Sequence, residues 1–440
     1  MKIPCLRWWI ASLLVAASVL NYLDRAALGF AATQIKAEFH LTETQYASIV
    51  SAFLAAYTIS YLVGGILVDR LGTRRSVVIT VTLWSAANMA HALSQSAVEL
   101  MLFRFLLGLG EAAFYPAAMR ACAEWFLPRD RSKPIGLFLG GASFGAVIAP
   151  VLMAWMMEMP NVGWRGAFAV TGAAGFLLLP FWLFMFRLPN RHSRITQVER
   201  EYLGETLAGD VKPERPWPLR KLLGLRQTAV LITARSLTDA SWYVLLFWLG
   251  KYFRESRGFD NAQVMLWLWI PYATADLGAL AGGWISSARI RSGSSVVSAR
   301  TGCMVAFALL LPFSLLGFLM PAPLAALALI SVATFGHMAW GTNSLTLHTD
   351  LYPAHSVGTM MGVTGAAGAL AGIAVQLALG QALDLTHSYL AVFITTACLH
   401  PLAAIIIRLG LRGMEAREEE PRLDLVAGEH LRAQGGPIVP

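Results

Sequence analysis

Long apolar runs separated by short polar stretches dominate the chain from residue 8 to residue 411. Twelve runs can be counted, six before and six after a polar stretch at 188–227. A helix of about 20 apolar residues, at about 1.5 Å per residue, crosses the hydrocarbon core of a bilayer. The pattern predicts twelve membrane spans, at 8–32, 45–68, 76–96, 98–121, 134–157, 166–187, 228–252, 262–287, 296–319, 322–348, 357–380 and 389–411.

These runs divide the chain into four parts: an N-terminal six-helix bundle, a cytoplasmic linker, a C-terminal six-helix bundle and a disordered cytoplasmic tail, at 1–187, 188–227, 228–411 and 412–440. The linker is rich in proline and charge, with a short helix expected at 196–207, where Thr196 and Glu199 resemble a capping box. The first run lacks a small-residue cleavage site, so we expect it to be retained.

Composition supports the same class of protein. Only 14% of the residues are charged, 56% are hydrophobic and the mean hydropathy is +0.57. A soluble protein would need more charge to cover its surface, so we expect an all-α polytopic membrane protein. The four cysteines are isolated, so no disulfide framework, metal site or cofactor is expected.

Basic residues are distributed unevenly between the two sides that the spans define. The side holding both termini and the linker carries most of them, and the opposite loops keep only Lys36, Arg165, Lys251, Arg254 and Arg257. An excess of Lys and Arg marks the cytoplasmic side. We therefore expect both termini in the cytoplasm, and the net charge of +8 indicates membrane insertion and anionic lipid, not a nucleic-acid partner.

The two groups of spans repeat a pattern. Span 2 ends in Gly64-Gly65-Ile-Leu-Val-Asp69-Arg70, and span 8 has Gly282-Gly283 at the equivalent place with Ser287 where the first copy has its acid. Such a repeat predicts two pseudo-symmetric bundles that rock about a central site.

Several charged residues fall inside spans. Those of span 7, Arg235 and Asp239, are four apart and could simply pair with each other. Asp24 and Arg25 lie in span 1, and Arg104 and Glu111 lie two helical turns apart on one face of span 4. Intramembrane charges are costly and mark functional sites. An arginine binds a carboxylate with two parallel hydrogen bonds, so Arg25 and Arg104 suit an anionic substrate. Buried acids can exchange a proton, so Asp24 and Glu111 are candidates for proton coupling, although Glu111 could be a neutral packing residue.

The segment from Gly65 to Arg75 resembles the loop 2–3 motif of the major facilitator superfamily. The segments 21–25, 104–116 and 336–346 resemble its anion:cation symporter branch, and span 10 is most similar to hexuronate (galacturonate and glucuronate) transporters. The resemblance implies transport across a bacterial inner membrane and a gating role for Asp69 and Arg70.

The same resemblance implies substrate contacts from other spans. Tyr57 of span 2 is equally suited to a ligand and to a neighbouring helix. In span 10, Trp340 could stack on a sugar ring and Asn343 could bind its hydroxyls, whereas His337 could equally be a packed residue. Span 5 departs from the branch, because Ser143 lies where many relatives have Asn or Gln facing the ligand.

Two other function classes would require motifs that the sequence lacks. An ATP-driven pump would need a GxxxxGK[ST] loop and an enzyme a cluster of nucleophile or metal ligands, and the sequence has neither. We therefore expect a secondary transporter that imports a sugar acid, most simply a hexuronate, by proton symport with alternating access, with sodium as the alternative coupling ion. We expect it to act as a monomer. The alternatives are another small carboxylate (aldonate, tartrate-like or aromatic acid) and a sugar-acid sensor that does not transport.

Overall fold

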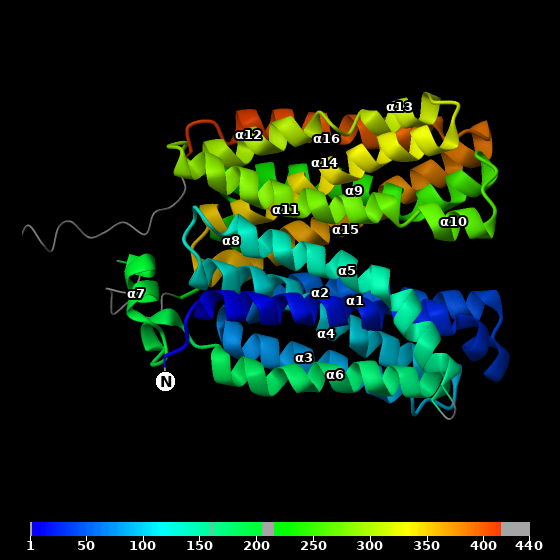
Figure 1. The fold of residues 1–440 in the computed structure, drawn as a ribbon, viewed down its shortest axis with the longest axis horizontal. Helices are drawn as coiled ribbons and strands as arrows, with labels where there is room; N and C mark the ends of the chain where they lie inside the picture. Colours follow the sequence, from blue (N-terminus) through cyan, green and yellow to red (C-terminus); the bar gives the residue numbers. More distant parts are fainter. Residues whose placement is uncertain (1, 160–161, 205–214, 415–440) are drawn as a thin grey trace, which may run out of the picture.

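The computed structural model describes residues 2–159, 162–204 and 215–414. Its long helices run side by side along one axis and form two halves (Figure 1). The first half consists of α1 (Leu6–Glu38), α2 (Glu43–Leu71), α3 (Thr73–His91), α4 (Ala97–Trp125), α5 (Ser132–Glu158) and α6 (Gly163–Met185). These six helices confirm the first six predicted spans.

The second half also contains six spans, two of which are broken. Its helices are α9 (Arg226–Glu255), α10 (Asn261–Trp267), α11 (Ile270–Arg291), α12 (Val296–Ala308), α13 (Phe313–Leu319), α14 (Pro323–Leu351), α15 (Ala354–Thr386) and α16 (Leu390–Gly410). Pro271 is at the second position of α11 and Pro312 caps α13. Proline cannot donate a helical hydrogen bond, so spans 8 and 9 are each divided into two helices.

The polar segment between the halves lies at the same end of the molecule as the N-terminus, and we call this the linker end (Figure 1). It contains η1 (Pro189–Arg191), α7 (Gln197–Leu203) and α8 (Leu219–Leu223). The Thr196 side chain caps α7 as expected, but the Glu199 carboxylate does not complete a capping box. It instead accepts the N–H groups of Leu6 and Arg7 at 3.0 and 3.1 Å, so the linker is attached to the start of α1. The expected tail, from residue 415, and residues 205–214 lie outside the described residues.

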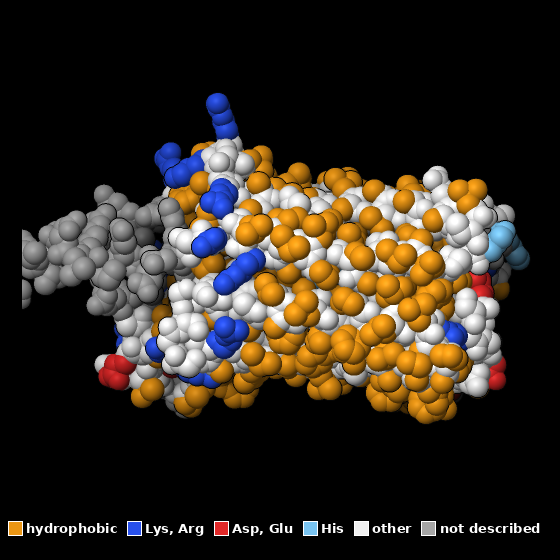
Figure 2. Space-filling view, turned by 90° about the horizontal axis from the view of Figure 1, so that it is seen from above, with side chains coloured by type: hydrophobic (Ala, Val, Ile, Leu, Met, Phe, Trp, Pro, Cys, Tyr) orange, Lys and Arg blue, Asp and Glu red, His pale blue; other side chains and the backbone are white. Residues whose placement is uncertain are grey.

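The lateral surface is that of a membrane protein. Hydrophobic side chains cover the middle of the molecule, and Lys and Arg side chains gather at the linker end (Figure 2). Large apolar side chains such as Val151, Leu177 and Leu377 are 66–74% exposed, which is favourable only in lipid. Of the described helical segments, eight are long and apolar enough to cross a membrane by themselves. The remaining long helices are more polar, and two of them, α4 and α9, hold buried charges.

The two halves meet where α2 contacts α15 and where α5 contacts α11. Gly65 of α2 faces the carbonyl of Gly358 in α15, and Gly283 of α11 faces the carbonyl of Ser132 in α5. A Cβ on either of these two glycines would overlap the opposing backbone, so only glycine permits the approach. Both contacts lie about two turns inside the linker-end terminus of α2 and of α11, and there the halves are packed backbone to backbone.

Candidate functional site

A buried ion pair joins α1 and α4 near the middle of the first half. Arg25 donates from Nε and Nη2 to the same oxygen, Oε2 of Glu111, at 3.2 and 3.1 Å. The Glu111 side chain is fully buried, whereas 28% of the Arg25 side chain is exposed. The other Glu111 oxygen has no partner among the described residues. Arg25 therefore offers an accessible positive charge that is held by one carboxylate.

Asp24 faces away from this pair. Its Oδ1 accepts a 2.7 Å hydrogen bond from Asn88 of α3, which also bonds Thr171 of α6 at 2.8 Å. Neighbouring helical residues project about 100° apart, so Asp24 points into the first half while Arg25 points toward α2 and α4. The two residues, placed together by the sequence, thus have different partners, and Asp24 has no side-chain contact with Arg25.

Arg104 of α4 reaches α1 beside Arg25 but binds backbone. Its Nη2 donates to the Arg25 carbonyl at 2.8 Å and Nη1 to the Asp24 carbonyl at 3.5 Å. Only 5% of Arg104 is exposed, and Nε has no partner among the described residues. Arg104 therefore holds the α1 backbone in this conformation, and its contact with a substrate stays a prediction.

Aromatic side chains of α2 flank the exposed guanidinium. The Tyr57 ring lies 4.7 Å from the Arg25 guanidinium carbon and 5.4 Å from the ring of Tyr61, one turn closer to the linker end. The Tyr22 ring lies 4.6 Å from Arg25 on another side. The partly exposed Tyr57 is thus beside the candidate charge, as a ligand-contacting residue would be.

The three candidates on α14 are not brought to Arg25. His337 is buried, with Nδ1 2.9 Å from Nε2 of His400, and its ring stacks on a tryptophan of α9 at 4.7 Å. Trp340 is 1% exposed. Asn343 is fully buried and donates to carbonyls of α11 and of its own helix at 3.0 Å each. In this conformation all three pack the second half, and their predicted substrate contacts stay untested.

The second half has a charged pair of its own. Arg235 Nε bonds Asp239 Oδ2 at 3.1 Å on α9, which confirms the pairing that their spacing suggests. Arg235 Nη2 also bonds the hydroxyl of Tyr61, on α2 of the other half, at 3.4 Å. Ser143 of α5, which departs from the branch pattern, lies close to Asp276 of α11 in the other half.

Asp69 connects the halves at the linker end. Its Oδ1 accepts from the Gly358 N–H at 3.0 Å and Oδ2 from the Thr359 N–H at 2.6 Å, both at the second turn of α15. Arg120 of α4 bonds Asp69 Oδ1 at 3.4 Å. Arg70 is exposed and has no bond to any described residue, so the charge that supports Asp69 comes from α4. Gating by Asp69 and Arg70 remains a prediction.

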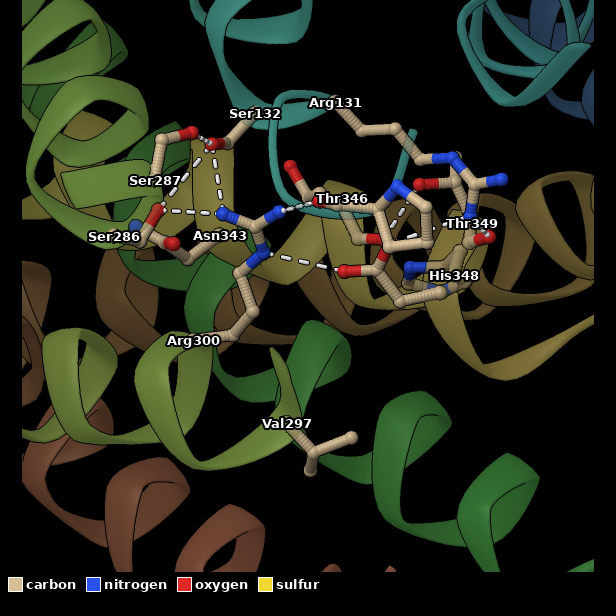
Figure 3. A network of polar contacts seen from close by, with 12 residues as sticks. Arg131, Ser132, Ser286, Ser287, Val297, Arg300, Asn343, Thr346, His348 and Thr349 are labelled. Atoms are coloured by element: carbon tan, nitrogen blue, oxygen red, sulfur yellow. Dashed lines mark hydrogen bonds and ion pairs between the residues drawn. The ribbon is translucent and has the colours of Figure 1, made fainter. Parts of the chain in front are cut away.

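A second polar network connects the halves at the equivalent place (Figure 3). Fully buried Arg300 of α12 pairs with Asp350 of α14 at 3.1 Å and donates to the Ser132 hydroxyl of α5 at 2.7 Å. Ser287, which replaces the acid of the first copy, lies 2.9 Å from the Ser132 hydroxyl. Arg131 reaches Asp350 at 3.4 Å from the first half. The second copy therefore joins the halves through serines, arginines and Asp350, with a serine at position 287 where the first copy has an acid.

The loop between α4 and α5 adds a charged group outside the membrane. Asp130 bonds Lys133 at 2.6 Å, the Tyr202 hydroxyl of α7 at 3.0 Å and Arg291 of α11 at 3.5 Å. Burial raises the pKa of Asp130, but the hydrogen bonds from Lys133 and Tyr202 outweigh it and hold that pKa below its usual range. Asp130 thus links the first half, the linker and the second half.

Arg120 and Arg300 take part in these networks although no sequence pattern above pointed to them. Arg300 lies in a helix whose other members are mostly apolar, a signal that could have found it. Arg120 lies one turn from Glu124, with which it pairs at 2.8 Å, and nothing local indicates that it also reaches Asp69.

Comparison with known proteins identifies the family. A family model described as Major Facilitator Superfamily matches residues 14–376. The chain belongs to the major facilitator superfamily. A hexuronate transporter of Escherichia coli (strain K12) is 30% identical over 421 residues, 95% of this chain and 96% of the relative. A galacturonate transporter of Dickeya chrysanthemi is 32% identical over 289 residues, 64% of this chain and 82% of the relative.

Solved structures agree on the fold of this superfamily member. The proton:xylose symporter XylE is 18% identical with a TM-score of 0.69, and the match covers 91% of this chain and 95% of that one. The predicted all-α architecture of twelve membrane helices is confirmed, and the protein is a multi-pass membrane transporter and not an enzyme.

Proposed function

We propose that this transporter imports a hexuronate or a related sugar acid by proton symport, with its linker end in the cytoplasm of a bacterial cell. The names of the relatives support the substrate class, since they include hexuronate, galacturonate and D-galactonate transporters. The basic linker end supports the orientation. Alternating access would open and close the contacts between the halves at that end.

The Arg25–Glu111 pair is the observation that supports this mechanism. Arg25 has 28% of its side chain exposed while Glu111 has none, so an anion can approach the guanidinium from its exposed side. Glu111 accepts hydrogen bonds from both Nε and Nη2 of Arg25, at 3.2 and 3.1 Å. A substrate carboxylate must compete with Glu111 for the same fork of N–H groups.

A proton on Glu111 removes that competition. The neutral acid holds Arg25 less strongly, and a bound carboxylate then makes protonation of Glu111 easier. This coupling is reciprocal and needs only about 1–3 kcal/mol to change each affinity. In the proposal Asp24 is the second proton-handling acid, acting through its bond to Asn88. Arg104, with Nε free of a described partner, is the second cation for the substrate.

The test is uptake of labelled galacturonate into proteoliposomes with an imposed pH gradient, with and without sodium. Glu111→Gln mimics the protonated acid, so we expect it to abolish gradient-driven accumulation and to keep exchange of galacturonate across the membrane. Glu38→Gln, which changes an acid at the far end of α1, is the matched control and should accumulate normally.

Two outcomes would contradict the proposal. Full gradient-driven accumulation in both Asp24→Asn and Glu111→Gln would exclude these acids from coupling, and strict sodium dependence would replace the proton. Competition by galactonate and by other small carboxylates in the same vesicles decides between a hexuronate and another acid. Saturable binding without uptake would indicate a sensor.

A further inference from the structure

The Arg235–Asp239 pair of α9 has no part in the mechanism above, yet it is built differently from a simple structural pair. The Arg235 side chain is 8% exposed, and the Asp239 side chain is 31% exposed. In the Arg25–Glu111 pair the cation is the accessible member, whereas here the anion is accessible. The two halves thus present groups of opposite charge.

The donors of Arg235 are bound to protein acceptors. Nε bonds Asp239, Nη1 bonds the Thr364 hydroxyl at 3.0 Å and the Met361 carbonyl at 3.3 Å, and Nη2 bonds the Tyr61 hydroxyl at 3.4 Å. Arg235 is therefore fixed from three helices and holds only one oxygen of its acid. Among the described residues, none donates to Oδ1 of Asp239.

Depth and contacts place this acid near the Arg25 site. Asp239 is thirteen residues from the start of α9 and Glu111 fourteen from the end of α4, so each lies about 20 Å from the linker-end terminus of its helix. Arg235 contacts Tyr61, whose ring contacts Tyr57, which lies against Arg25. An unbroken row of contacts thus runs from one charged pair to the other.

We propose that Asp239 binds hydroxyl groups of the sugar acid whose carboxylate is bound by Arg25, and that Arg235 is its positioning residue. This inference rests on the proposed function. A carboxylate oxygen is a strong acceptor for a hydroxyl donor, with hydrogen bonds about twice as strong as neutral ones. The adjacent guanidinium offsets the negative charge, so an anionic substrate is not repelled as it would be by an isolated acid.

The consequence is selectivity for hydroxylated acids. Arg25 recognises any carboxylate, while Asp239 gains a partner only when the rest of the molecule carries hydroxyl groups. A site that hydrogen-bonds a substrate hydroxyl discriminates strongly against the analogue that lacks it. A metal ion is a poorer occupant, because no group of three His, Cys, Asp or Glu side chains suited to a metal occurs in the described part of the chain.

The experiment compares two acids of equal charge, D-galacturonate and tetrahydropyran-2-carboxylate, which keeps the ring and the carboxylate but has no hydroxyls. Each competes with labelled galacturonate in exchange across proteoliposomes. For Asp239→Asn and Asp239→Ala we expect the inhibition constant of galacturonate to rise roughly 10-fold to 150-fold, the range for a hydrogen bond to a charged group. That of the unhydroxylated acid should stay the same. Arg235→Lys should raise the inhibition constant of galacturonate by a smaller factor, because Asp239 remains but is held less firmly. The inhibition constant of the unhydroxylated acid should again stay the same.

Glu255→Gln is the matched control, since it changes the acid of another i,i+4 pair on α9 and should alter neither constant. The inference would be overturned if Asp239→Asn weakened the binding of both acids equally, or if it left the binding of galacturonate unchanged. Loss of pH-gradient accumulation with both constants unchanged would also overturn it, because Asp239 would then be a coupling acid. If the parent chain takes up no galacturonate, the proposed function itself fails, and this inference fails with it.

Discussion

Replacing Asp69 by asparagine is expected to weaken the closed linker end. The Asp69 side chain is fully buried and accepts the N–H groups of Gly358 and Thr359 at 3.0 and 2.6 Å, with Arg120 at 3.4 Å. Asparagine has one acceptor oxygen, so it can keep one of the two N–H bonds. Its amide group then faces a second donor, and the charge opposite Arg120 is lost.

The cost follows from these contacts. A hydrogen bond to a charged group contributes about 1.5–3 kcal/mol, so the ratio of closed to open molecules should fall roughly 10-fold to 150-fold. These bonds exist only while the halves are together at this end, so the substitution shifts the balance between states and leaves the substrate residues unchanged. The maximal rate of uptake should fall several-fold, and the half-saturating concentration should change less.

Distances between spin labels measure the shift directly. Leu71 at the end of α2 and Ser292 after α11 are exposed on opposite halves at the linker end. Cysteines placed there, with the exposed Cys5 and Cys398 changed to serine, accept the labels. We expect a longer distance component in Asp69→Asn that is weak in the parent chain.

Asp384→Asn makes the same chemical change at the far end of α15, where Asp384 is exposed, and should leave the distances unaltered. Identical distance distributions in Asp69→Asn and the parent chain, together with an unchanged maximal rate, would refute the reasoning and leave Asp69 as a topology determinant.

Three further predictions follow from single contacts. Arg25→Lys should weaken sugar-acid binding about 10-fold or more, because an ammonium cannot make the two-bond fork seen with Glu111, and a binding isotherm checks this. Arg300→Met should lower the free energy of unfolding by about 3 kcal/mol, since Asp350 loses a buried partner at 3.1 Å; thermal unfolding should recover in the double variant with Asp350→Leu. Burial lowers the pKa of His192 below its ordinary value, so its contribution to linker docking is complete above about pH 6.5 and is lost as the pH falls through the folded pKa. Limited proteolysis of the linker at pH 7 and pH 5 measures this, and a His192→Phe chain should show no such pH dependence.

The spans were predictable because the backbone N–H and C=O groups of a chain segment in lipid have no water to bond to. An apolar run of membrane length must satisfy its hydrogen bonds internally, so it forms a helix whatever its neighbours are. The breaks before α11 and α13 lie inside apolar runs, and hydropathy does not register them. Only the prolines at 271 and 312 mark them, and proline within a membrane helix is often tolerated.

The partners of the charged residues were harder to predict. Asp24 and Arg25 are adjacent in sequence, but helical rotation directs them to different neighbours, Asn88 and Glu111. Arg70 is the nearest cation to Asp69 in the chain, whereas the observed partner comes from α4. Such pairings depend on which helices pack together, which local spacing does not contain.

The glycine contacts between the halves have a consequence for mutational tolerance. At Gly65 and Gly283 the opposing backbone leaves no volume for even a methyl group. Any substitution there would push the two halves apart, whatever the chemistry of the new side chain. Positions such as Leu377, 66% exposed to the lipid side, can exchange among apolar residues at little cost. A saturation library selected for uptake would therefore retain a narrow stripe of invariant glycine where the bundles touch, surrounded by freely varying positions. Sequence variation in this protein is therefore most restricted where the backbones of the two halves are in contact.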